Sequence, residues 1–232
     1  MKKLCFFILA FMIICGNAFG AIEYRSANFH TNSASTKTNT ITKPTGTIDD
    51  DVMVAIITCN NSGQTVTPPA GWTSLQKDGT SYGATTEIFW KLASSEGVEY
   101  TFTIGTEARN TGVIASFSGC DIADVIDGST VNNSSSTNQV ALGITTGTDN
   151  VMLVFLGGLD TSSTRTWTPP SGFDEAIETD SVAPAEISYG IQESQGASGD
   201  KTAVISGSSS GISSLVSLNP AAAPTRRIMV IQ

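Results

Sequence analysis

The stretch TEIFWKLA, Thr86 to Ala93, alternates two kinds of side chain, and AEISYGIQ, Ala185 to Gln192, repeats the pattern later in the chain. Successive side chains of a β-strand point to opposite faces, so the alternation predicts a strand with one core face and one solvent face. Glu87 and Glu186 fall on the expected solvent face, where charged residues limit edge-to-edge association. The expected core face holds Ile88, Trp90 and Leu92 in the first copy and Ile187, Tyr189 and Ile191 in the second.

The repetition extends over nearly the whole chain. DDVMVAII, Asp50 to Ile57, matches DNVMLVFL, Asp149 to Leu156, and both are apolar without interruption after the acidic start. Short runs of this kind, rich in β-branched residues, indicate strands that are covered on both faces. The segments His30 to Thr47 and Thr111 to Gly119 also recur, as Val131 to Thr148 and, more loosely, as Ser210 to Leu218.

No long amphipathic helical pattern interrupts these strand signals. With about six strands in each copy, the spacing predicts an all-β chain: an antiparallel sandwich of jelly-roll or concanavalin-like size, built from two similar halves. Residues 21–127 form the first half and residues 128–219 the second, followed by a linker and tail over 220–232. The junction between the halves lacks a flexible-linker composition, which favours one continuous body.

A doubled turn motif joins two of the strands in each half. VTPPAGWTSL, Val66 to Leu75, returns as WTPPSGFDEA, Trp167 to Ala176. Proline ends a strand because it lacks a donor, and glycine permits the tight reversal that follows. Trp72 and Phe173 share one repeat position, so we expect both to pack in the core. Trp167 replaces a valine, and it is therefore the better candidate for a surface contact.

The N-terminus has the features of an export signal. Lys2 and Lys3 precede the apolar run Leu4 to Cys15, and a short polar stretch ends at Gly20. This arrangement predicts a signal peptide over residues 1–20, because the apolar run is shorter than the roughly 20 residues of a spanning helix. We expect a secreted, periplasmic or cell-surface protein with no membrane span after cleavage.

Charge and cysteine content narrow the partners. The 21 acidic residues outnumber the 12 basic ones, for a net charge of −9. Such a chain repels phosphate groups, so we expect no nucleic-acid partner. Outside the signal only Cys59 and Cys120 remain, and an exported protein can keep a disulfide. A bridge between them and two unpaired thiols are equally open alternatives.

Catalytic and metal-binding patterns are sparse. His30 is the only histidine and has no supporting nucleophile motif, so we expect neither a serine triad nor an enzyme. No cofactor is expected either. Asp121, Asp124 and Asp127 are weak candidates for calcium, but their spacing matches no known calcium loop, and turn formation is the preferred interpretation.

Aromatic side chains carry the remaining binding hypothesis. An aromatic ring beside polar groups can stack on a sugar ring. The candidate ligand-binding residues are Trp167, Phe89 and Tyr82, and the expected partner is a surface glycan or another virion or cell-surface protein. Self-association into a homo-oligomer is also compatible with the sequence.

An ordered set of motifs gives a family resemblance. The set comprises DDVMVA, VTPPAGWTSL, FWKLA, YTFT and FSGCD, and with the second copy it covers about Thr31 to Pro220. It resembles a duplicated, jelly-roll-like β-sandwich domain of phage-associated and exported bacterial proteins. The resemblance implies a non-enzymatic attachment or structural module on a surface or a virion. The alternatives are a carbohydrate-binding module and, third, a glycoside hydrolase with two carboxyl groups.

Overall fold

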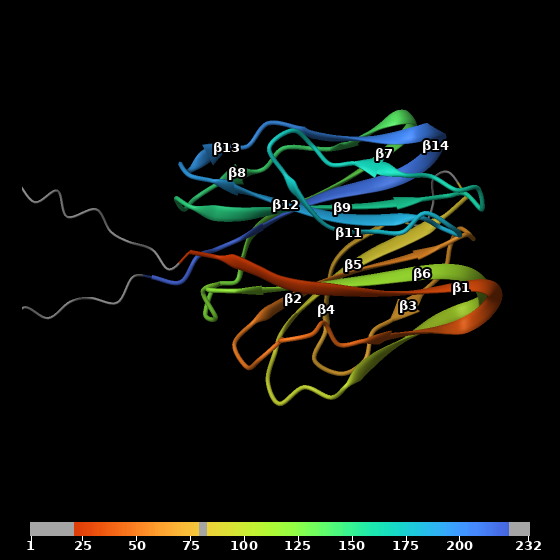
Figure 1. Ribbon diagram of the computed structural model, residues 1–232, viewed down its shortest axis with the longest axis horizontal. Helices are drawn as coiled ribbons and strands as arrows, with labels where there is room; N and C mark the ends of the chain where they lie inside the picture. The colour runs from red at the N-terminus through yellow and green to blue at the C-terminus, as the bar shows by residue number, and fades with distance from the viewer. Residues whose placement is uncertain (1–20, 79–82, 223–232) are drawn as a thin grey trace, which may run out of the picture.

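The computed structural model describes residues 21–78 and 83–222, so the expected signal peptide lies outside the described residues, as does the end of the tail. The described chain is all-β and forms two six-stranded antiparallel sheets (Figure 1), which confirms the predicted fold class. It contains no helix that could cross a membrane. Each sheet takes its strands from one sequence copy.

The two sheets repeat the same strand order. The first has the order β1-β6-β2-β5-β4, with β3 paired to β6, and its strands are β1 (Glu23–Thr42), β2 (Val52–Cys59), β3 (Val66–Thr67), β4 (Thr73–Asp78), β5 (Thr85–Leu92) and β6 (Glu99–Ser118). The second has the order β10-β14-β9-β12-β11, with β7 paired to β14, and its strands are β7 (Ile126–Ala141), β9 (Val151–Leu159), β10 (Trp167–Thr168), β11 (Asp174–Glu178), β12 (Ala185–Gln192) and β14 (Lys201–Leu218). A two-stranded sheet pairs β8 (Thr145–Thr146) with β13 (Gly196–Ala197).

The sheets pack face to face over a shared central core. Val54 and Ile56 of β2 meet Val154 and Leu156 of β9 in this layer. At the sheet edges β1 lies against β11 and β4 against β7, and the Tyr24 hydroxyl donates to the Ala176 carbonyl oxygen over 3.1 Å. The two sequence copies therefore form a single body, as the junction composition predicts.

Each half also encloses a core of its own on the outer face of its sheet. The paired strands β1 and β6 are 20 residues long, and register shifts around Thr36 interrupt their pairing. Beyond this irregularity β6 carries Tyr100, Phe102 and Ile104 into a cluster with the outward residues of β2 and β5. Bulges bend strands in this way, so the long β1–β6 strand pair folds over its own sheet. β7 and β14 do the same in the second half.

A buried amide network holds the bend of the β1–β6 strand pair. The Asn39 side chain donates to Asn110 Oδ1 over 2.6 Å, and the Asn32 side chain donates to the same oxygen over 3.0 Å. The Asn110 amide in turn donates to Thr36 Oγ1 and to the Ala108 carbonyl oxygen. The network also reaches the backbone, because Asn110 donates to the Ala108 carbonyl oxygen, Asn39 to that of His30 and Asn32 to that of Thr38.

The folded-over strand pairs β1–β6 and β7–β14 correct the expectation that Glu87 and Glu186 face solvent. Glu87 and Glu186 point to the outer faces of their sheets, as the alternation predicts, but both are buried, with exposed fractions of 6% and 0%. The reason is that an outer face covered by a folded-over strand pair is a second core rather than a solvent surface. The two carboxyl groups lie on opposite outer faces, so they do not flank a common cleft.

The structure also decides between the cysteine alternatives, because both thiols are free and buried. Cys59 belongs to the outer core of the first half, whereas Cys120 belongs to the central core. The first sheet separates these two layers, so the side chains do not meet. Burial raises the pKa of each thiol to about 12, with further contributions from Glu87 at Cys59 and from Asp51 at Cys120.

Candidate binding groove

The aromatic residues proposed from the sequence do not form a binding platform. Trp167 and Phe89 are buried, with exposed fractions of 5% and 0%, which corrects the expectation of exposure. Phe89 packs 5.4 Å from Phe102 in the outer core of the first half. Trp167 covers Gly157, which lies on the outer face of β9. Tyr82 lies outside the described residues.

The two aromatic residues of the turn motif differ in burial. Trp72 is a core residue, as predicted, with edge-to-face contacts to Tyr100 at 5.2 Å and to Phe102 at 5.5 Å between ring centroids. Phe173 has the same repeat position but is only half-buried, and it packs at the margin of the second outer core. The expectation of a core position therefore holds fully for Trp72 alone.

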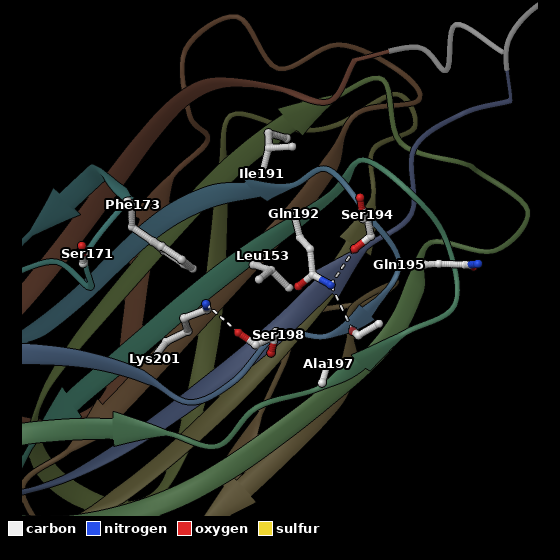
Figure 2. A pocket seen from close by; sticks show the side chains of 12 residues that line it. Leu153, Ser171, Phe173, Ile191, Gln192, Ser194, Gln195, Ala197, Ser198 and Lys201 are labelled. Carbon is white, nitrogen blue, oxygen red and sulfur yellow. Dashed lines mark hydrogen bonds between the residues drawn. The ribbon is translucent and has the colours of Figure 1, made fainter. Parts of the chain in front are cut away.

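The exposed part of Phe173 lines a groove of about 520 Å³ at one end of the second half. This volume lies within the range of small-molecule sites. Figure 2 shows the Phe173 ring and the Lys201 ammonium group pointing toward each other, with Leu153 between them and Gln192. We call this hollow the Phe173 groove; the residues that matter most in it are Leu153, Phe173, Gln192, Ser198 and Lys201.

Comparison of the strand registers explains the hollow in the second half. Tyr100 pairs with Ile41 across β6 and β1, and at the corresponding place Lys201 pairs with Ala141 across β14 and β7. Two residues further along each strand, Ala203 takes the place of Phe102. The aromatic rings that surround Trp72 are thus absent around Phe173.

A glycine adds to the same effect. Ile88 of β5 and Ile187 of β12 are equivalent, because both face the central core. Three residues further along each strand, Gly190 therefore takes the place of Lys91. A Cβ atom on Gly190 would come within 3.0 Å of the Phe173 ring. The small residue therefore lets the ring lie against the backbone of β12, beside the groove.

Fixed polar groups surround the apolar floor. The two N–H donors of the Gln192 amide are shared among Thr146 Oγ1 and the carbonyl oxygens of Ser194 and Gly196, each 3.0 Å from the nitrogen. These bonds hold the side chain in place and leave its oxygen, Oε1, outside them. Lys201 Nζ donates to the Ser198 carbonyl oxygen over 2.7 Å and lies 5.9 Å from the Phe173 ring centroid.

The charge of Lys201 is not neutralised within the groove. In the first half, Lys91 forms an ion pair with Glu96 over 2.8 Å, and Tyr100 donates to the same carboxylate. In the part of the chain that the structure describes, no carboxylate forms an ion pair with Lys201. The described lining of the groove contains no Asp or Glu.

The three aspartates of the junction have separate hydrogen-bond partners. Asp121 Oδ1 accepts from the Ala123 amide, Asp127 Oδ2 accepts from the Gly147 amide, and the Asp124 carbonyl oxygen accepts from the Asn219 side chain. Among the described residues, no three His, Cys, Asp or Glu side chains gather as metal ligands would. The Asp121 contact is typical of a turn, whereas Asp127 belongs to β7 and accepts from a residue 20 positions away.

A buried carboxyl group lies elsewhere on the same outer face. Burial is the main cause that raises the pKa of Glu186 to about 8; the Ser188 hydroxyl opposes the rise, and the neighbouring carboxylates Glu175 and Glu178 contribute to it. Its counterpart Glu87 has complementary partners, since the Ser74 hydroxyl donates to it over 2.8 Å and Lys77 Nζ lies 3.8 Å away. Glu186 does not line the Phe173 groove.

Comparisons of the chain with protein families, with curated proteins and with solved structures found no match. Sequence reasoning missed the groove because it treated Phe173 as a core residue by analogy with Trp72. The strand registers, rather than the sequence match, show that small or charged residues replace the aromatic partners of Trp72 in the second half.

Proposed function

We propose that this chain is an exported, non-enzymatic β-sandwich that serves as an attachment module on a cell surface or a virion, with the Phe173 groove as its saccharide-binding site. The groove carries this proposal: an aromatic ring stands beside hydrogen-bonding groups, as recognition of a sugar requires. The resemblance to phage-associated and exported domains supports the surface or virion setting.

A binding role fits the groove better than glycoside hydrolysis. Hydrolysis of a glycosidic bond needs two carboxyl groups held about 5 to 10 Å apart across the substrate. The described lining residues supply none, and Glu87 and Glu186 are buried on opposite outer faces of the sandwich. The residues of the groove offer an apolar surface, an ammonium group and an amide oxygen, which can bind but not cleave.

A glycan array with the purified protein tests the proposal. We expect binding to a subset of surface glycans, and we expect Phe173→Ala to abolish it because the stacking surface is lost. Phe29→Ala is the matched control, since Phe29 is a half-exposed aromatic residue on β1, in the other half. Binding that survives Phe173→Ala, or no binding to any glycan, would refute the assignment. N-terminal sequencing of exported protein should begin at Ala21.

A further inference from the structure

The Phe173 groove contains one positive charge in an acidic protein. Lys201 is half-buried, its ammonium group faces the hollow, and a single hydrogen bond to the Ser198 carbonyl oxygen holds it (Figure 2). An ammonium group has three donors and no acceptor, so two N–H bonds remain for a ligand. The groove thus presents a cationic donor in a chain whose net charge is −9.

The comparison of the two halves strengthens this point. In the first half Lys91, Glu96 and Tyr100 satisfy one another. In the second half Lys201 stands in place of the tyrosine, and the described lining of the groove supplies no carboxylate. A charged group has therefore taken the position of a buried ring, and none of the described residues forms an ion pair with it.

We infer that the Phe173 groove binds a saccharide that carries a carboxylate group, with the carboxylate paired to Lys201. This inference rests on the proposed saccharide-binding function and names the class of sugar. The ring of Phe173 supports the apolar face of the sugar, and Gln192 Oε1 accepts from a sugar hydroxyl group. The absence of Asp and Glu from the described lining means that no like charge opposes the carboxylate.

Binding of matched glycans tests the inference. The probes are oligosaccharides of α-1,4-linked galacturonate, the neutral galactose oligosaccharides of the same length and linkage, and an array of glucuronate-, sialate- and sulfate-bearing glycans. We expect carboxylated glycans to bind best. Lys201→Met keeps the length of the side chain and removes its charge, and we expect it to weaken their binding by about tenfold to a hundredfold, as for loss of a charge-assisted hydrogen bond.

Two further variants make the test specific. Lys201→Arg keeps the charge and should retain most of the affinity, whereas Lys37→Met removes a charge from an exposed site on β1 and should have no effect. Thermal unfolding of each variant establishes that the fold is intact. The affinity of the unchanged protein should also fall as salt concentration rises, because salt screens the ion pair.

The outcomes separate this inference from the proposed function. If neutral glycans bind as well as carboxylated ones and Lys201→Met changes nothing, the carboxylate assignment is wrong while the saccharide-binding function stands. Stronger binding of sulfated than of carboxylated glycans also overturns it. If no glycan binds and Phe173→Ala has no effect, both the function and the inference fail.

Discussion

Trp167 and Gly157 form a complementary pair on the outer face of the second sheet: a Cβ atom on Gly157 would lie 2.5 Å from Cη2 of the Trp167 ring. In the first half the corresponding residues are Val66 and Ile57, both buried in the outer core. Relative to the first half, β10 therefore has a larger side chain, and β9 lacks the side chain that would collide with it. This exchange explains why Trp167, which has no aromatic counterpart, is nevertheless a core residue.

Gly157→Ala should destabilise the protein because the added methyl group displaces the Trp167 ring. We expect a loss of about 1–3 kcal/mol in the free energy of unfolding, as for other overpacked cores. Chemical denaturation measures it. Gly97→Ala is the control, since Gly97 has open space around its Cα. If the pair is complementary, Trp167→Val should relieve much of the cost of Gly157→Ala in a double-mutant cycle. Purely additive costs would contradict the pairing.

The strands and their inward faces could be predicted from the sequence because a period of two is a local property. Ile88, Trp90 and Ile187 face the central core as the alternation indicates. The folding of each long strand pair over its own sheet could not be predicted, because it depends on bulges deep within strands of 18 to 20 residues. Glu87 was placed in solvent for this reason.

The candidate site was missed for a related reason. The match of Thr111–Gly119 with Ser210–Leu218 sets Val113 against Ile212, whereas the strand registers set Val113 against Ser214. This shift of two residues conceals the equivalence of Tyr100 and Lys201. Register is set by pairing between strands, and a loosely repeated serine-rich segment does not specify it.

The buried amide network of the β1–β6 strand pair gives a second prediction. Asn110→Ala removes the oxygen that accepts from the Asn39 and Asn32 amides. One N–H of the fully buried Asn39 amide then has no acceptor. A loss of about 1–3 kcal/mol in the free energy of unfolding is expected from the unpaired group. Asn138→Ala, at an exposed position of the matching strand β7, should change stability little. Equal effects of the two substitutions would show that the network does not support the bend.

The two free cysteines give a third prediction. Because thiolates rather than thiols react with alkylating agents, thiols with pKa values of about 12 should stay unmodified in the native protein at pH 8. Peptide mapping after treatment with iodoacetamide should find Cys59 and Cys120 unmodified until the protein is unfolded. Reductant should leave the unfolding midpoint unchanged. Modification that requires both unfolding and prior reduction would reveal a disulfide and contradict the observed separation of the two side chains.

The environment of Glu186 differs from that of Glu87 in a way that pH can expose. Register places Lys77 opposite Glu87 in the first half and Glu178 opposite Glu186 in the second. The Ser74 position is likewise taken by Glu175. Glu186 thus has two carboxylates as neighbours where its counterpart has an ammonium group and a hydroxyl, and neither of its oxygens has a hydrogen-bond partner of good geometry.

Glu186 should therefore make the protein less stable as pH rises. Its pKa is near 4.5 in the unfolded chain and about 8 in the folded protein, so between these values the unfolded state gives up the proton first. Each pH unit in this window lowers the free energy of unfolding by about 1.4 kcal/mol, with no further loss above pH 8. Chemical denaturation at pH 5, 6.5, 8 and 9 should show this decline, and Glu186→Gln should largely remove it because the amide cannot ionise. Glu99→Gln, at an exposed position, should leave the decline intact. Parallel pH profiles for the unchanged protein and Glu186→Gln would mean that Glu186 ionises as readily in the fold as in the unfolded chain.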